Sequence, residues 1–220
     1  MMKRLLMGIG MCVALGGVSA NAAGLDITLI ADYDHGNSNE IEAQTRALQA
    51  LKAASPELDC LFMEVDPSVS APIADFMAGR GSYYSTVAPW VNQLEAEIGY
   101  SFRNVIPSYF LTDIQGLGLK VYGVDVNFRS PAGAAVIRAL QAYSAAPANN
   151  VAAQRSFVES GIVERNRLIA RNARSEFLSR RCTKAALIVG ASHLDNTVGG
   201  IPSLPLWTLL IEQGFAVTMD

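Results

Sequence analysis

Apolar and polar positions alternate in blocks along the chain, and the first three blocks predict a strand, a helix and a second strand. Residues 25–31 are short, apolar and β-branched, which is typical of a buried strand. Residues 40–54 carry apolar side chains at helical spacing, with Asn39 as the expected N-cap and Pro56 just beyond the end. Residues 59–65 form the next apolar block. Together they predict a right-handed βαβ unit with buried parallel strands.

The rest of the chain returns to this pattern after an irregular segment, residues 66–117. Prolines, glycines and many of the aromatic residues gather there, which favours a helical lobe packed by aromatics and placed over a site at the strand ends. Later strands are expected at 119–126, 184–190 and 215–219, and helices at 131–145, 151–181 and 203–213. Whether 151–181 is one helix or two joined near Gly161 is open. The alternation predicts an α/β fold, a three-layer sandwich with a mainly parallel sheet.

The N-terminus has the pattern of a secretory signal peptide. A basic start is followed by an apolar run at residues 5–18 and by the small-residue sequence Ala20-Asn21-Ala22. The run is shorter than the roughly 18 apolar residues that span a bilayer, so no transmembrane segment is expected after cleavage. We expect residues 1–22 to be removed and residues 23–220 to form a single α/β domain that is periplasmic or secreted.

Composition narrows the possible functions. The chain has 220 residues, of which 50% are hydrophobic and 17% charged, which excludes a disordered protein. Signal cleavage removes two basic residues and no acid, which takes the net charge from −3 to −5, and without a basic run nucleic acid is excluded as a partner. Cys60 and Cys182 remain in a compartment where disulfides persist. Whether they pair is open, because sequence cannot test the geometry that a disulfide requires.

The chain contains two histidines, and both follow predicted strands. The polar residues at the strand ends are Asp32, Asp34, His35, Glu64, Asp66, Asp125, Ser192, His193 and Asp195. Ligands of open α/β sheets bind at this edge. Two imidazoles and a carboxylate can hold a divalent metal with an open position for water, or can act without a metal as a base and its partner. We therefore expect His35, Glu64 and His193 to be catalytic residues and candidate metal ligands.

A second group of candidates surrounds the arginine-rich segment before the strand at 184–190. Arg165 and Asn166 begin a predicted helix there. A forked guanidinium can bind a carboxylate, either one in the site or one on a substrate. We expect Arg165, Asn166 and Asp125 to bind the substrate.

Two sets of motifs resemble known proteins over nearly all of the mature chain. Segments 164–166, 184–194, 199–201 and 209–217 resemble the C-terminal half of the TraB/GumN/Tiki proteins: an Arg-Asn helix, an apolar strand ending in Gly-x-x-His-Leu, a glycine turn, a short helix and a final strand. Segments 34–37 and 62–64 are similar to the related ChaN-like and erythromycin-esterase-like proteins. The resemblance implies an α/β fold and a site of two histidines and a glutamate, to which His35, His193 and Glu64 correspond.

The resemblance also implies a function. Members of that superfamily include secreted or membrane-tethered metal-dependent peptidases, esterases and a haem-binding lipoprotein. It therefore implies a hydrolase that cleaves an amide or ester bond in a peptide or small molecule, with a divalent metal. The alternatives are a periplasmic protein that binds haem or another small ligand through His35, His193 or a tyrosine of the lobe, and a non-catalytic binding module. The chain departs from the family at residues 32–35, where Asp-Tyr-Asp-His replaces Gly-Glu-x-His or Gly-Thr-x-His, so catalysis by this motif is open, as are the metal, the substrate and the oligomeric state.

Overall fold

The computed structural model describes residues 24–99 and 107–220. The signal peptide expected at residues 1–22 lies outside this range, as do residues 100–106 of the expected lobe. Within the described part, no helix combines the length and the apolar character needed to cross a membrane.

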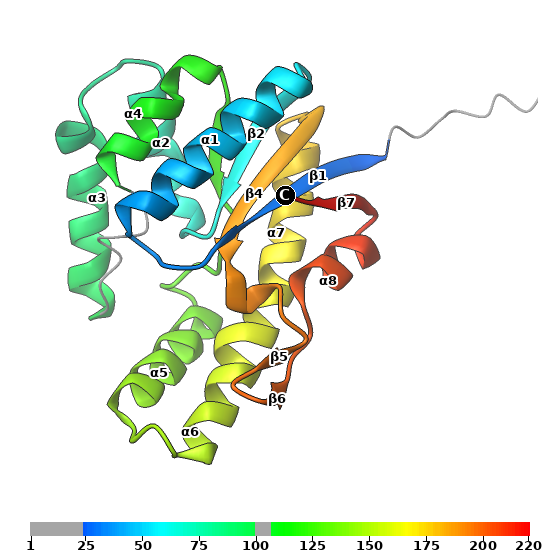
Figure 1. The fold of residues 1–220 in the computed structure, drawn as a ribbon. Helices are drawn as coiled ribbons and strands as arrows, with labels where there is room; N and C mark the ends of the chain where they lie inside the picture. The colour runs from blue at the N-terminus through cyan, green and yellow to red at the C-terminus, as the bar shows by residue number, and fades with distance from the viewer. Residues whose placement is uncertain (1–23, 100–106) are drawn as a thin grey trace, which may run out of the picture.

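Five parallel strands form the central sheet in the order β3-β2-β4-β1-β7 (Figure 1). They are β1 (Leu25–Asp32), β2 (Leu58–Met63), β3 (Lys120–Gly123), β4 (Lys184–Gly190) and β7 (Phe215–Met219). The first two strands are parallel as predicted, but β4 lies between them, so they are not neighbours. β3 is shorter than predicted, although the N–H groups of Val124 and Asp125 still bond to the carbonyls of Met63, the last residue of β2, and Val65, at 3.0 and 3.1 Å.

Helices connect the strands. They are α1 (Ser38–Ala54), α2 (Ser70–Met77), α3 (Tyr83–Ile98), α4 (Ser108–Ile114), α5 (Pro131–Ala145), α6 (Val151–Ser156), α7 (Arg165–Ser179) and α8 (Leu206–Glu212). A π-helix, η3 (Phe157–Glu164), connects α6 to α7, so the segment predicted as one or two helices is a continuous run whose irregular part, η3, includes Gly161. The predicted N-cap of α1 is wrong, because Asn37, not Asn39, caps it and accepts the Asn39 N–H at 2.9 Å.

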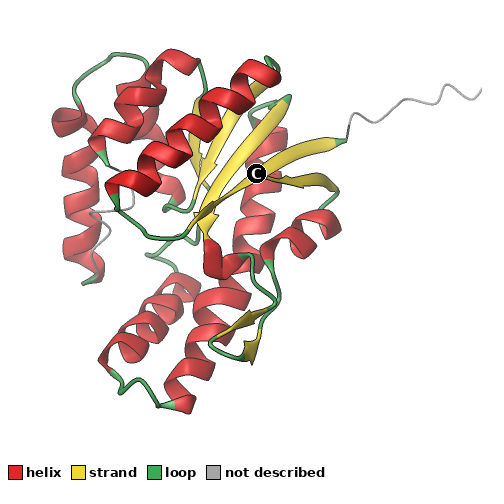
Figure 2. Ribbon diagram, in the orientation of Figure 1, coloured by secondary structure: helices red, strands yellow, loops and turns green. Residues whose placement is uncertain are grey.

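The helices cover both faces of the sheet, which confirms the three-layer α/β sandwich (Figure 2). Strand side chains alternate between the faces. In β2, Leu61 and Met63 pack against α1, α2, α3 and α4, whereas Cys60 and Phe62 face α7 and α8. Both faces are apolar, so the central strands are continuous hydrophobic runs rather than alternating ones.

Short elements complete the chain. They are the 3-10 turns η1 (Pro67–Val69), η2 (Gln115–Leu117) and η4 (Ala191–His193), and a hairpin of β5 (Thr197–Val198) and β6 (Ile201–Pro202). In Figure 1, α5, α6 and the hairpin lie together at the end of the sheet where β4 leads into η4. The described residues of 66–117 are largely helical, as predicted, but α2, α3 and α4 belong to one layer of the sandwich.

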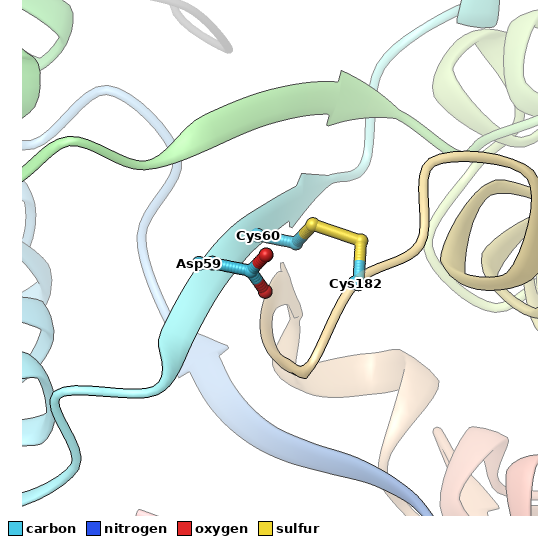
Figure 3. Close-up of side chains that lie close together, drawn as sticks. All are labelled: Asp59, Cys60 and Cys182. Atoms are coloured by element: carbon cyan, nitrogen blue, oxygen red, sulfur yellow. A yellow bond between two sulfur atoms is a disulfide. The ribbon is translucent and has the colours of Figure 1, made fainter.

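A disulfide joins Cys60 of β2 to Cys182, just before β4, which resolves the question left open by the sequence (Figure 3). The Asp59 carboxylate lies beside it. That carboxylate accepts the Thr183 N–H at 2.8 Å and pairs with Lys120 at 3.0 Å. This end of the sheet is opposite to the one where the candidate residues gather.

Candidate functional site

Five of the six predicted site residues form one buried group at the carboxyl end of the sheet. Glu64 follows β2, Asp125 follows β3, Arg165 and Asn166 begin α7, and His193 ends η4. We call these five residues the Arg165 cluster. They converge because β2, β3 and β4 are adjacent and parallel, which brings their ends together.

Arg165 is the centre of this cluster and binds two carboxylates. Its Nε donates to Asp125 Oδ1 at 2.7 Å, and its Nη2 pairs with Asp125 Oδ2 and, at 2.7 Å, with Glu64 Oε1. The guanidinium also lies 5.8 Å from the centre of the Phe128 ring, a distance that suits a cation–π contact. Both carboxylates held by the forked guanidinium therefore belong to the protein itself.

His193 is held from both sides of its ring. Asn166 donates its side-chain NH2 to the carbonyls of His193 and Leu204, at 3.1 and 2.9 Å, so its Oδ1 is left as an acceptor for His193 Nδ1 at 2.5 Å. Nδ1 must therefore carry a hydrogen. Nε2 lies 3.3 Å from Glu64 Oε1 and 3.5 Å from Arg165 Nη1. With 3% of the residue exposed, this imidazole is fully engaged inside the protein.

Glu64 uses both of its carboxylate oxygens. Oε1 contacts Arg165 and His193, and Oε2 accepts the Gly190 N–H at 2.7 Å. Burial by itself would raise the pKa of Glu64, but the charge of Arg165 together with the contact to His193 outweighs it and holds that pKa far below its ordinary value. Glu64 is therefore an ionised carboxylate and not a proton donor near neutral pH.

His35, the sixth predicted residue, lies outside the cluster and pairs with Asp32. Its Nδ1 lies 2.6 Å from Asp32 Oδ2, and 47% of its side chain is exposed. The hydrogen bond to Asp32 raises the pKa of His35 above its ordinary value, against the effect of partial burial, and the charge of Glu64 acts in the same direction as Asp32. Among the described residues, no hydrogen bond to Nε2 is formed.

Gly190 lies between His35 and the Arg165 cluster. A Cβ at this position would lie 3.0 Å from His35 Nε2 and 3.3 Å from Glu64 Oε2. The φ and ψ angles of Gly190, −54° and 136°, are open to any residue. Glycine therefore suits this position because a side chain would crowd its neighbours, and not because of the backbone conformation. The His35 ring rests against the backbone at the end of β4.

A cavity of about 290 Å³ opens beside these residues. Its polar side includes Asp32, His35, Glu64, Arg165, Ser192 and His193, and its apolar side consists of Leu140, Phe157 and Ile162. The apolar wall thus comes from α5 and η3 and not from residues 66–117, which contribute no described residue to this cavity. Tyr33, 79% exposed, lies at its edge.

The geometry does not fit a divalent metal held by His35, Glu64 and His193. Among the described residues, one set of three candidate ligands brings its ligand atoms within 4.8 Å of one another, and it is Asp59, Cys60 and Cys182. The two sulfurs of that set are bonded to each other (Figure 3). At the predicted site the guanidinium of Arg165 lies against Glu64, so it already supplies the positive charge that a metal would bring.

Several residues matter here in ways the sequence did not reveal. Asp32 orients His35, whereas the side chain of Asp34 accepts a hydrogen bond from the Asn37 side chain at 2.9 Å. Asp66 has a structural role, because it caps η1 and accepts the Phe128 N–H at 2.8 Å. The wall residues Leu140, Phe157 and Ile162 had no signal beyond their apolar character.

The chain is similar to two solved structures, whereas comparisons with protein-family models and with curated proteins find no match. The type III effector HopBA1 has 18% sequence identity and a TM-score of 0.51, and the match covers 82% of this chain and 75% of that chain. The structure described as cofacial heme binding to ChaN of Campylobacter jejuni has 12% identity and a TM-score of 0.51, with 90% and 82% covered. At such identities the likeness concerns the fold, so this chain has a fold like that of ChaN.

Proposed function

We propose that this chain is an exported protein that binds haem, or a planar metal complex like it, in the cavity beside His35. The observation that carries the proposal is the state of His35. Its Nδ1 is held by Asp32 at 2.6 Å while Nε2 takes no partner among the described residues, at the edge of a cavity with an apolar wall. Histidines that ligate metals commonly donate their second ring N–H to a carboxylate in this way.

Haem suits this geometry better than a bare ion does. A protein-bound zinc ion takes three or four protein ligands, and no such set forms around His35 within the described residues. Haem iron, held by its porphyrin, needs one axial protein ligand, commonly a histidine. Leu140, Phe157 and Ile162 offer an apolar face for the macrocycle, and the exposed Tyr33 ring offers a second aromatic surface at the edge.

Two further findings support the proposal. The solved structure of ChaN, which has a similar fold, is described by its cofacial haem binding. The Cys60–Cys182 disulfide suits an oxidising compartment, which agrees with the signal peptide expected at residues 1–22. The protein would then meet its ligand outside the cytoplasm.

The proposal is tested by titrating haem into the mature chain, purified without a histidine tag, and following the Soret band. Wild-type protein should shift the band at micromolar haem, and the His35→Ala variant should lose the shift. The Asp34→Asn variant is the matched control, because it changes a neighbouring exposed residue whose side chain bonds only to Asn37. The Tyr33→Phe variant should bind as wild type does if His35 is the ligand. No Soret shift with wild-type protein would contradict the proposal.

Hydrolysis is a second candidate, and the Asp32–His35 pair favours it. A histidine whose Nδ1 is held by a carboxylate can remove a proton from water through Nε2. In that case, ester or peptide substrates would be cleaved by the wild-type chain in the presence of a chelator, and the His35→Ala variant would lose this activity. Binding of haem without turnover of either substrate class would reject this candidate.

A further inference from the structure

A small cavity lies on another side of His35, beneath α1. Its volume is about 20 Å³, and its lining includes Asp32 at the end of β1, Gln44 of α1 and Phe110 of α4. Much of the rest of the wall is apolar, with Ile41, Met63 and Ile188 among its members. The cavity thus has a mixed wall, with polar side chains from Asp32, His35, Gln44 and Glu64 among the apolar ones.

Two of those polar groups have atoms without a partner. Asp32 Oδ1 and Gln44 Nε2 are both shielded from solvent, and neither forms a hydrogen bond within the described part of the chain. Only 6% of Gln44 is exposed, so its amide has no direct access to bulk water. A buried polar atom left unpaired costs about 1–3 kcal/mol, so two of them on residues that line the same cavity call for a shared partner.

We propose that one water molecule is bound in this cavity, where it accepts a hydrogen bond from Gln44 Nε2 and donates one to Asp32 Oδ1, and that Gln44 is thereby a positioning residue for His35. The volume fits, since one water needs roughly 10–15 Å³ of such space and two to four polar partners. The chemistry also selects water. An amide N–H needs an acceptor and a carboxylate oxygen needs a donor, and water is both, whereas a cation would be repelled by the amide hydrogens.

The water has a consequence for the site. With Oδ1 bonded to the water and Oδ2 to His35 Nδ1, the Asp32 carboxylate is fixed at both oxygens and cannot rotate away from the ring. The imidazole is then held as the Nδ1–H tautomer, which leaves Nε2 without a hydrogen and with a lone pair that can accept a proton or bind a metal. This positioning exists without any ligand, and only its effect on haem affinity rests on the proposed function.

The Gln44→Leu variant tests the proposal, because it removes the donor and keeps a side chain of similar bulk. Thr45→Val is the matched control, since it deletes the buried hydroxyl of the next residue, which bonds to the Ile41 carbonyl within α1 and does not line the cavity. A high-resolution crystal structure of wild-type protein should contain a water within hydrogen-bond distance of both Asp32 Oδ1 and Gln44 Nε2. Nitrogen NMR at alkaline pH should give a single Nδ1–H tautomer for His35 in wild type and Thr45→Val, and a mixture in Gln44→Leu.

Each outcome decides the question. A wild-type crystal structure without that bridging water overturns the proposal, whether or not the Gln44→Leu variant folds. An unchanged tautomer in a folded Gln44→Leu variant overturns the positioning role of Gln44. If both hold, haem affinity of Gln44→Leu should fall about 10-fold, with Thr45→Val unchanged, since loss of a partner that orients a metal ligand typically costs 10–100-fold. A wild-type protein that binds no haem would overturn the proposed function and leave the water site to be decided by the first two measurements.

Discussion

The Arg165 cluster and the Asp32–His35 pair lie on two sides of Gly190, and each contains one of the two histidines of the chain. In the cluster, both ring nitrogens of His193 lie against Asn166, Glu64 and Arg165, and the residue is 3% exposed. In the pair, Asp32 holds one ring nitrogen of His35, and the other takes no hydrogen-bond partner among the described residues, in a ring that lines the cavity. The comparison teaches that polar character at a strand end does not define a reactive group. An unfilled bonding position beside a cavity is the more informative sign.

Removal of the central guanidinium should have the largest effect. The Arg165→Met variant leaves Glu64 and Asp125 buried without their shared cation, so the free energy of unfolding should fall by about 3–5 kcal/mol. Chemical denaturation measures this. Arg167→Met is the control, because Arg167 forms an exposed pair with Glu164, and its loss should cost less than about 1 kcal/mol. Equal effects of the two variants would mean that the cluster does not hold the fold.

Replacement of the two histidines should affect the stability of the protein and haem binding differently. His193→Ala leaves Asn166 Oδ1 without its donor and opens a space in the cluster, so we expect a loss of about 2–3 kcal/mol in the free energy of unfolding. His35→Ala removes a half-exposed ring and should stay within about 0.5 kcal/mol of wild type while losing the haem signal. Denaturation and haem titration of both variants check this. If His35→Ala lost stability and His193→Ala lost the haem signal, the roles assigned to the two residues would be wrong.

A methyl group added at Gly190 should disturb the Asp32–His35 pair more than the Arg165 cluster. In the Gly190→Ala variant the new Cβ meets His35 Nε2 at 3.0 Å and Glu64 Oε2 at 3.3 Å. His35 is half-exposed and can swing outward, so the stability loss should be about 1 kcal/mol, at the low end for an overpacked site. Haem affinity should fall clearly. The Gly199→Ala variant is no control here because its φ is positive, whereas Gly24→Ala, where a Cβ meets nothing, should leave the affinity unchanged.

The smallest effect should depend on pH. Because folding raises the pKa of His35 above its unfolded value, the stabilisation by Asp32 is fully present below that unfolded value, near 6.5, and is lost as pH rises through the folded pKa. The stability difference between wild type and Asp32→Asn should therefore be larger at pH 5.5 than at pH 8.5. Denaturation curves at the two pH values measure it. The Asp34→Asn variant should give no such pH dependence, and a difference that grows at high pH would contradict the assignment.

Most of the fold was predictable because each strand and helix has its own local pattern. The strand at 184–190, the helix at 131–145 and the strand at 215–219 occur with the predicted bounds. The N-cap of α1 was not predictable by position alone, since Asn37 and Asn39 both suit a cap and the turn after β1 selects the first. The hairpin of β5 and β6 has two-residue strands, which are too short to give a periodic signal.

The location of the site was predictable from the sequence, but the hydrogen bonds and ion pairs among its residues were not. Strand ends indicate where Glu64, Asp125 and His193 gather, yet the partners depend on β4 lying between β2 and β1, which local patterns do not encode. That order brings the Gly190 N–H to Glu64 and places Arg165 between two acids. The cavity wall at Phe157 and Ile162 depends on a π-helix, a rare element that the helical spacing of residues 151–181 did not predict.

The Cys60–Cys182 disulfide has a consequence for the assembly of the site. It ties β2 to β4 across 122 residues of sequence, at the ends opposite to the site, and so favours the pairing that aligns Met63 with Ile188. Slippage by one residue would carry the Glu64 carboxylate away from the Gly190 N–H and turn the side chains of one strand to the wrong layer. A chain whose two cysteines are still reduced lacks this constraint on the register, so the Arg165 cluster should form later in its folding than in that of the oxidised chain.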